Sequence, residues 1–296
     1  MEKIRKTRNF FISPNQEDLK IRNFLPHSKL EILKMEKTAI IIPAYNEEKR
    51  IGVTLEKYVK FLKEKKKIRE LDDFEILVVL NACKDNTLEV VKEKQKKFKE
   101  IIFLNFEKGG KGFAITEGFR DSLRRNNELI GFVDADMATP PEAFYSLMKN
   151  IGNYDGILAS RWMKESIIKT KQTAIRIITS RGFNFLIKSI LFLPYKDTQC
   201  GAKLFRKKAI ESVISDLGIT RWAFDIDLIY KLRKKNFKIK EIPTIWEDKR
   251  GSKLNLIKVP FQMFSSIIRL RLIYSPFKFI VRLYNKLPEK IRIHNW

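Results

Sequence analysis

The sequence predicts an α/β protein with a doubly wound, mainly parallel sheet and helices on both faces. Short apolar runs alternate with helical patterns, and no internal repeat or low-complexity linker interrupts them. Such apolar runs are typical of strands buried on both faces of a parallel sheet. Strands that alternate with helices at this spacing are joined by right-handed crossovers.

The regular pattern begins at residue 38. The predicted strands are 38–42, 74–80, 101–106 and 129–133, and Pro43 ends the first of them. We expect helices over residues 47–66, 86–99 and 112–125, the second starting with Asn86 and Glu89 at the spacing of a capping pair. The sequence therefore predicts an extension over residues 1–37, a domain over 38–254 and a basic segment over 255–296.

Composition restricts the class of protein before any motif is considered. The 296 residues are 44% hydrophobic and 32% charged, as in a folded chain. Cys83 and Cys200 are too few for a disulfide framework, which fits a reducing cytosol. His27 and His294 lie near the termini, which argues against a histidine base or a histidine-ligated zinc site. We expect neither a membrane-spanning helix nor a signal peptide.

The net charge of +25 requires an acidic partner or surface. Residues 249–296 carry eleven lysines and arginines against one acid, Glu289. Large apolar residues alternate with these bases, which favours two amphipathic helices, interrupted near Pro276, on an anionic membrane surface. The alternative is a C-terminal helix that packs on its own domain. Because nucleic-acid tails are usually polar between their charges, we expect no nucleic-acid partner.

Two carboxylates, Asp134 and Asp136, directly follow the apolar run at residues 129–133. Open α/β sheets bind their ligands at the carboxyl ends of strands. Two hard oxygen ligands at such a place suit Mg²⁺ or Mn²⁺ holding a diphosphate. Taken alone, a D-x-D triplet is more often a solvated turn or a helix cap.

Two further loops follow predicted strands. Tyr45 and Glu47, after the first strand, can stack on and hydrogen-bond a nucleoside, although taken alone such residues more often form a proline turn before an acidic helix start. Residues 108–112 read Lys-Gly-Gly-Lys-Gly, which lets backbone N–H groups and ammonium groups approach a phosphate. The spacing of a Walker A loop is absent.

Together these segments resemble the family 2 glycosyltransferases with the GT-A fold. The resemblance begins with residues 40–48, 75–79, the 108–112 loop and Asp134-Ala135-Asp136. Later segments are similar to dolichyl-phosphate glucosyltransferases and their mannosyl relatives, namely Ser160-Arg161, residues 197–205, residues 221–227, Trp246 and residues 250–253. These motifs occur in one consistent order from about residue 38 to residue 255.

The resemblance implies a site for a nucleotide diphosphate sugar with Mg²⁺ or Mn²⁺. Asp136 would be the direct metal ligand and Asp134 would support the metal or the ribose. The remaining contacts implied by the resemblance are Pro43, Ala44, Tyr45, Glu47, Lys111 and Ala135, with Arg250, Ser252 and Lys253 in a flexible loop at the diphosphate. Relatives usually carry acids after the second strand, where this chain has Asn81, whose amide can also hydrogen-bond a base.

The resemblance also implies a lipid phosphate acceptor. Arg161, Arg176 and Arg181 occupy the region where relatives bind that phosphate, and Arg161 and Arg181 are also expected to be catalytic. Of Asp225 and Asp227, we expect Asp225 to be the base or to orient the acceptor. The apolar stretch at residues 181–193 would lie at the membrane together with the C-terminal helices.

The leading hypothesis is an inverting, metal-dependent transferase at the cytoplasmic face of a membrane. It moves a sugar, with glucose favoured, from a nucleotide diphosphate sugar to a polyprenyl (dolichyl) phosphate. The alternatives are GDP-mannose or another donor, a lipid-linked glycan as the acceptor, and a basic nucleic-acid-binding protein built on the same fold.

Overall fold

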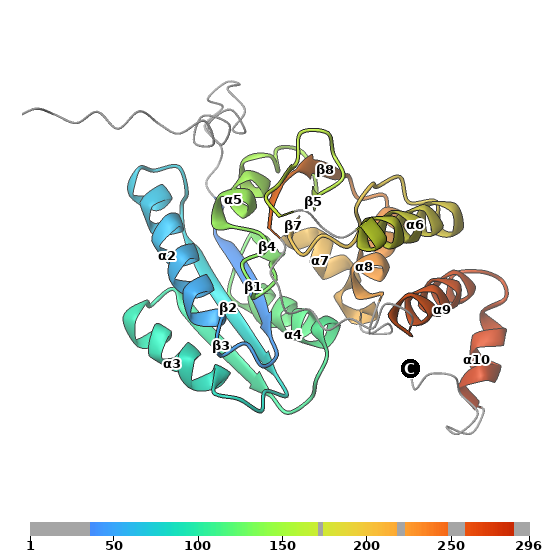
Figure 1. Ribbon diagram of the computed structural model, residues 1–296, viewed down its shortest axis with the longest axis horizontal. Helices are drawn as coiled ribbons and strands as arrows, with labels where there is room; N and C mark the ends of the chain where they lie inside the picture. Colours follow the sequence, from blue (N-terminus) through green and yellow to red (C-terminus); the bar gives the residue numbers. More distant parts are fainter. Residues whose placement is uncertain (1–35, 171–173, 218–222, 248–257, 287–296) are drawn as a thin grey trace, which may run out of the picture. The chain divides into compact units, whose positions relative to one another are not determined.

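The computed structural model describes residues 36–170, 174–217, 223–247 and 258–286. Seven strands form the main sheet in the order β3-β2-β1-β4-β7-β5-β8 (Figure 1). They are β1 (Thr38–Ala44), β2 (Phe74–Asn81), β3 (Ile101–Phe106), β4 (Leu129–Phe132), β5 (Gly156–Ser160), β7 (Lys203–Arg206) and β8 (Ile239–Pro243). All neighbours are parallel except at β7, which is antiparallel to both β4 and β5. The predicted fold class is confirmed.

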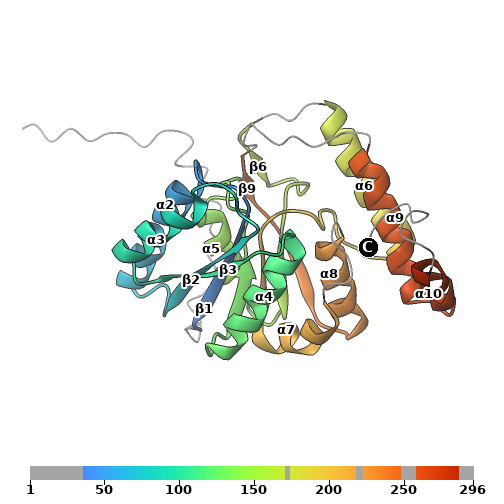
Figure 2. The ribbon, with the colours of Figure 1, turned by 90° about the horizontal axis from the view of Figure 1, so that it is seen from below.

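Helices cover both faces of the sheet (Figures 1 and 2). One face carries α2 (Ile51–Lys67), α3 (Thr87–Lys97) and α5 (Pro141–Lys149). The other carries α4 (Lys111–Arg124), α7 (Lys207–Val213), the 3-10 helix η1 (Ile214–Asp216) and α8 (Phe224–Lys234). In β1, Ile40 and Ile42 pack into the first core and Ile41 into the second, because successive side chains alternate between faces. This two-sided burial explains the uninterrupted apolar run.

Two sequence-based details of the helices were wrong. The first helix begins at Ile51 rather than at Glu47, whose backbone N–H donates to Thr87 Oγ1 at 2.7 Å. Asn86 precedes the second helix without a side-chain capping bond, and Glu89 instead pairs with Lys92 at 2.9 Å. Contacts between neighbouring loops therefore override the local start signals.

The remaining elements are a small sheet and three helices. The sheet pairs β6 (Ile167–Ile168) with β9 (Ile245–Trp246), and the helices are α6 (Ala174–Leu191), α9 (Lys258–Ile273) and α10 (Lys278–Lys286). Figure 2 shows α9 beside α6, with α10 following. In α9, Ile267 and Leu270 are buried in the second core, so this helix packs partly on its own domain, as the alternative anticipated.

Pro276 lies between α9 and α10, where the sequence predicts an interruption. None of the described helices combines the length and apolar character that crossing a membrane requires. The predicted domain boundaries, at residues 37/38 and 254/255, stay predictions.

Two helical glycines give a test of the packing. A Cβ at Gly118 in α4 would lie 2.6 Å from Ile41 Cγ2, whereas a Cβ at Gly182 in α6 meets no atom within 4 Å. We expect Gly118→Ala to lower the free energy of unfolding by about 1–2 kcal/mol through overpacking. Gly182→Ala should raise it by about 0.5–1 kcal/mol through helix propensity. Urea denaturation measures both, and equal changes in the two variants would contradict this packing.

Candidate active site

The topology brings several strand ends to one edge of the sheet. Parallel strands β1, β2, β4 and β5 all finish there, and antiparallel β7 begins there. The residues at these strand ends and in the adjoining loops are therefore neighbours, although they are far apart in the chain. They are Pro43, Ala44, Tyr45, Glu47, Asn81, Asp134, Ala135, Asp136, Arg161, Cys200, Gly201 and Lys203.

Asn81 joins three loops at this edge. Its side-chain Nδ2 donates to the Ala44 carbonyl at 2.8 Å, and its Oδ1 accepts from the Gly110 backbone N–H at 3.0 Å. The side chain is buried. Asn81 thus holds the end of β1 against the glycine-rich loop, and one amide hydrogen and one lone pair of Oδ1 are left for the base contact that the sequence predicts.

The loop after β1 presents one exposed ring and one held carboxylate. The Tyr45 side chain is 54% exposed, and Glu47 accepts hydrogen bonds from Arg50 at 2.7 and 2.8 Å. Burial raises the pKa of Glu47 above its ordinary value, opposed by Arg50 and reinforced by the charges of Asp136 and Asp134. Glu47 therefore belongs to the same electrostatic cluster as the two aspartates.

The turn that carries the aspartates is fixed by helix α2. Thr54 Oγ1 donates to the Ala135 carbonyl at 2.7 Å, and the Tyr58 hydroxyl donates to the Thr139 carbonyl at 2.8 Å. Asp136 Oδ1 accepts from the Ala138 backbone N–H at 2.9 Å. These bonds hold the backbone of the turn before any ligand arrives.

Asp134 lies between a lysine and a glycine. Lys111 Nζ, at the start of α4, is 2.5 Å from Asp134 Oδ1. A Cβ at Gly201 would fall 2.0 Å from Asp134 Oδ2, so only glycine leaves room for this carboxylate. The loop before β7 and the Asp134 turn are consequently in direct contact.

The charges at this turn suit a divalent cation. Burial raises the pKa of Asp136, and the neighbouring negative charge of Asp134 raises it further. The described residues include no group of three carboxylate, histidine or cysteine ligands. A metal held by Asp136 and Asp134 would therefore need ligand oxygens from water or a diphosphate, which is the usual arrangement for Mg²⁺.

Arg161 is bound by a buried carboxylate. Its guanidinium donates to Asp197 at 2.7 and 2.9 Å, and its backbone N–H donates to the same carboxylate at 2.9 Å. The guanidinium also lies 5.6 Å from the Trp162 ring and 5.4 Å from the Trp246 ring. Arg161 is thus held in a fixed position, and Asp197 occupies two of its five guanidinium N–H donors.

The guanidinium of Arg181, in α6, has fewer partners than that of Arg161 among the described residues. It lies 5.1 Å from the Trp162 ring and pairs with no carboxylate among the residues that the structure describes. Trp162 therefore contacts both Arg161 and Arg181, which the sequence assigned together to the acceptor phosphate. Arg176 lies in the first turn of α6, and its side chain is outside the described part of the chain.

Asp225 and Asp227 have different partners in the structure. Asp225 Oδ1 lies 2.6 Å from the ammonium of Lys203. Burial raises the pKa of Asp225, but the charges of Lys203 and Lys111 outweigh it, so the pKa falls below the ordinary value. Asp227 instead pairs with Lys231 at 2.8 Å and accepts a hydrogen bond from Tyr274 of α9. Asp225 is therefore the one whose electrostatic partners include Lys111 at the site.

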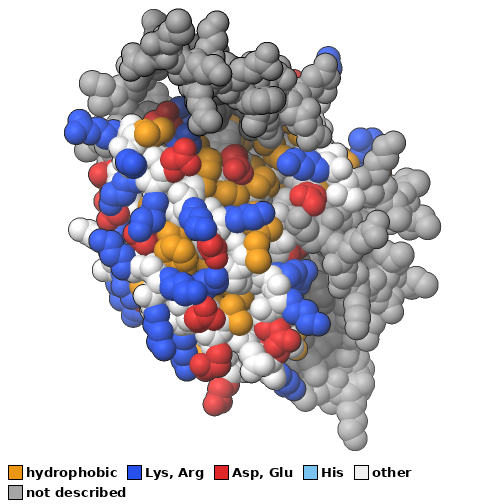
Figure 3. Space-filling view, turned by 60° about the vertical axis from the view of Figure 1, so that its left-hand side comes forward, with side chains coloured by type: hydrophobic (Ala, Val, Ile, Leu, Met, Phe, Trp, Pro, Cys, Tyr) orange, Lys and Arg blue, Asp and Glu red, His pale blue; other side chains and the backbone are white. Residues whose placement is uncertain are grey.

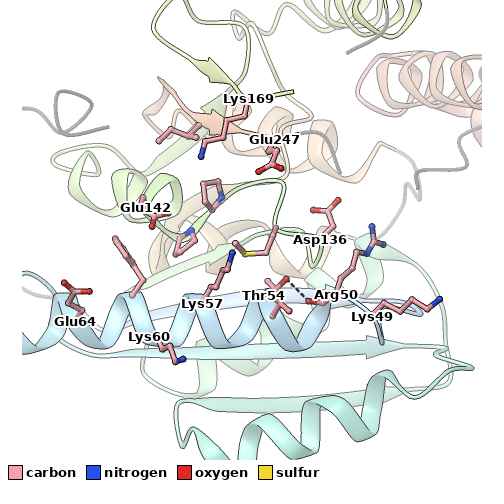
Figure 4. A pocket seen from close by; sticks show the side chains of 16 residues that line it. Lys49, Arg50, Thr54, Lys57, Lys60, Glu64, Asp136, Glu142, Lys169 and Glu247 are labelled. Atoms are coloured by element: carbon pink, nitrogen blue, oxygen red, sulfur yellow. Dashed lines mark hydrogen bonds between the residues drawn. The ribbon is translucent and has the colours of Figure 1, made fainter. Parts of the chain in front are cut away.

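A cavity of about 710 Å³ opens beside Asp136, between α2, the turn before α5 and the strands β6 and β9. Figure 4 shows Lys57 and Lys169 extending into it from opposite sides, with Asp136 and Glu247 at one end. Figure 3 shows lysine and arginine side chains around an apolar area on the forward face. The Glu247 backbone N–H donates to the Ala138 carbonyl at 2.9 Å, which fixes β9 beside the aspartate turn.

Sequence reasoning assigned no role to several residues of this site. Gly201 and Lys203 fall inside the segment at 197–205 that carries the resemblance, and Trp162 directly follows Arg161. Thr54 gives no sequence signal, because its contact with Ala135 depends on the packing of α2. Arg250, Ser252 and Lys253 lie outside the described residues, so their role at the diphosphate stays a prediction.

Comparison with known proteins identifies the class. Residues 39–214 match the model of glycosyl transferase family 2. The chain belongs to this family, as the resemblance predicted, and is a glycosyltransferase.

Curated relatives extend the match beyond the family domain. The dolichyl-phosphate beta-glucosyltransferase of Trichomonas vaginalis is 34% identical over 245 residues, covering 80% of this chain and 73% of that protein. The dolichyl-phosphate beta-glucosyltransferase of Homo sapiens is 31% identical over 250 residues, covering 80% of this chain and 75% of its own.

Solved structures share the fold at low sequence identity. Mannosyl-3-phosphoglycerate synthase from Rubrobacter xylanophilus aligns with a TM-score of 0.59 at 14% identity, covering 86% of this chain and 79% of that one. Glucosyl-3-phosphoglycerate synthase from Mycobacterium tuberculosis, in complex with Mn²⁺, uridine diphosphate and phosphoglyceric acid, gives 0.58 at 14% identity, with 80% and 78% covered. At this identity the likeness bears on the fold alone.

The buried pair between Asp197 and Arg161 can be tested by unfolding. Asp197→Asn leaves a mostly buried guanidinium without its counter-charge, so we expect the free energy of unfolding to fall by about 3 kcal/mol in denaturant titrations at pH 7. Asp73→Asn removes an exposed pair with Lys66 and should cost less than about 1 kcal/mol.

The effect of Asp197→Asn should also depend on pH. Burial raises the pKa of Asp197, but Arg161 outweighs it and holds the pKa below the ordinary value. The stabilisation is therefore present at neutral pH and is lost as the pH falls through the pKa of the folded state. Equal costs for Asp197→Asn and Asp73→Asn at pH 7 would contradict this assignment.

Proposed function

We propose that this glycosyltransferase moves glucose from a nucleotide diphosphate sugar to a polyprenyl phosphate such as dolichyl phosphate. The observation that carries the proposal is one sheet edge with an aspartate turn on one side and arginines on the other. The names of the curated relatives support the choice of glucose and of a dolichyl phosphate.

On the donor side, the proposed roles follow from charge and exposure. The exposed Tyr45 ring stacks on the base, and Asp134 and Asp136 hold Mg²⁺ or Mn²⁺. Such a metal, when bound, neutralises charge that builds on the departing diphosphate. Lys111 supplies a second cation, because Asp134 outweighs its partial desolvation and keeps the pKa of its ammonium above the ordinary value. The contacts of Pro43, Ala44 and Glu47 shape this half of the site.

On the acceptor side, the phosphate needs cations rather than a strong base. A phosphate monoester is already largely anionic near pH 7, so its oxygen can attack the anomeric carbon directly, with inversion. Arg181, which has no carboxylate partner among the described residues, binds this phosphate, and Arg161 supports it from a fixed position. The pKa of Asp225 is below its ordinary value, so Asp225 is an anion, and in this form it orients the acceptor.

We also propose that α6, α9 and α10 bind an anionic membrane surface at the cytoplasmic face. Large apolar side chains are exposed on these helices, namely Phe185, Phe264, Ile268, Phe279, Ile280 and Leu283, with Phe192 and Phe277 beside them. Lysines and arginines occur along the same segments. This combination of exposed rings and cations is typical of interfacial helices. A lipid phosphate held at the membrane surface would reach Arg181, which is part of α6.

The metal role predicts the behaviour of one substitution. Asp136→Ala removes the direct ligand without disturbing the core, so we expect a loss of transfer of at least about a hundredfold and a melting temperature close to that of the wild type. Calorimetry with Mn²⁺ and a nucleotide diphosphate sugar should show weaker binding as well. An Asp136→Ala protein that folds, binds metal and nucleotide normally and retains full activity would refute the role. Glu142→Ala, in the first turn of α5, is the carboxylate control.

The membrane proposal predicts which side chains drive binding. Truncating the chain before α9 would also remove Ile267 and Leu270 from the core, so point substitutions are the sharper test. We expect the triple change Phe277→Ser, Phe279→Ser and Leu283→Ser to reduce flotation with phosphatidylserine vesicles at least about tenfold, because it removes exposed apolar area.

The control for this experiment is Ile68→Ser, at an apolar residue of similar exposure just after α2. It should float as the wild type does. Flotation that is unchanged by the triple substitution, or equal with zwitterionic phosphatidylcholine vesicles, would contradict the proposal.

A further inference from the structure

Lys203 is a lysine with no exposed side-chain area. Its ammonium donates to the Cys200 carbonyl and to Asp225 Oδ1, each at 2.6 Å, and it lies 5.2 Å from the Phe132 ring. Burying an ion pair costs several kcal/mol of desolvation, and a well-packed apolar side chain is often as stable or more so. Stability alone therefore does not account for a lysine at this position.

The position of Lys203 explains what its charge can reach. Lys203 is the first residue of β7 and pairs in register with Phe132, the last residue of β4. Since Asp134 follows Phe132 by two residues, the Cα of Lys203 lies beside the aspartate turn. Its ammonium then reaches the first turn of α8, where Asp225 lies. Lys203 thus connects the sheet edge to the acceptor-side helix.

Two lysines of different character act on the charge of Asp225. Lys111 is 42% exposed and is bound to Asp134, so ligands on the donor side can change its position. Lys203 is enclosed and has two fixed acceptors. Asp197, the partner of Arg161, contributes a further negative charge near both Asp225 and Lys203. Of the two lysines, only Lys203 can hold Asp225 in one place throughout a reaction.

We propose that Lys203 is a positioning residue for the transfer reaction: it holds the Asp225 carboxylate as an anion in a single orientation toward the acceptor. The inference rests on the proposed function for the identity of the acceptor, but not for the contact itself. Lys203 acts only through Asp225 and touches no substrate.

Helix α8 contains a matched pair for comparison. Asp227 and Lys231 are also buried, at 1% and 5% side-chain exposure, and are 2.8 Å apart. Their further partners are the Asp216 carbonyl and the Tyr274 hydroxyl, rather than residues of the loops at the strand ends. Loss of Lys231 therefore removes a buried lysine from a buried aspartate on the same helix without changing Asp225.

The test is a double-mutant cycle in the full-length protein, with Lys203→Met, Asp225→Asn and the double variant. We expect Lys203→Met to lower kcat about tenfold or more while KM for the nucleotide sugar changes less than about twofold. In the Asp225→Asn background, Lys203→Met should cause no further loss of kcat, because its target is already gone. Lys231→Met should lower the melting temperature and leave kcat unchanged.

Several outcomes would overturn the proposal. They are an unchanged kcat in Lys203→Met, losses that multiply independently in the double variant, or an equal loss of kcat in Lys231→Met. If Lys203→Met does not fold, Lys203→Gln keeps a polar but uncharged side chain, and the same expectations apply. The cycle is run with whichever acceptor the wild type uses. A wild type that ignores polyprenyl phosphate but glycosylates a lipid-linked saccharide would therefore refute the proposed acceptor while still testing Lys203.

Discussion

The site depends on one topological constraint, the antiparallel insertion of β7 between β4 and β5. Because β7 runs against its neighbours, its first residues lie at the edge where the parallel strands end. Gly201 and Lys203 thereby reach Asp134 and Asp225, whereas a parallel strand would place them at the opposite edge. The close approach of Gly201 to Asp134 follows directly from this arrangement.

Charge balance gives the two halves of the site their different chemistry. On the proposed donor side, Asp134 and Asp136 leave negative charge only partly compensated by Lys111, which favours a further cation. On the proposed acceptor side, Asp197 and Asp225 are each paired with a buried or nearly buried base, Arg161 and Lys203. These carboxylates stay ionised, so they can fix and orient groups but are poor proton acceptors. The geometry therefore favours an acceptor that is already an anion.

The sequence predicted the fold well because its main signal is burial. The apolar runs at β1, β2 and β4 are buried on both faces, and two-sided burial leaves little choice of structure. The aspartate turn and the loop after β1 were predictable for the same reason, since each follows a clear strand. Helix starts were less predictable, because Glu47 and Asp85 bond to each other's loop segments as well as to the starts of their own helices.

Long-range partners had no signal in a single sequence. Three contacts arise only when the elements pack. They are the hydrogen bond between Asn81 and Gly110, the pairing of Arg161 with Asp197, and the different lysine partners of Asp225 and Asp227.

The most direct measurement of the whole account is an acceptor assay with the purified protein, Mn²⁺ and a panel of UDP and GDP sugars. The account predicts that UDP-glucose yields a polyprenyl phosphate glucose when polyprenyl phosphate is supplied. Transfer only to a lipid-linked saccharide, with polyprenyl phosphate left unchanged by every donor, would contradict it.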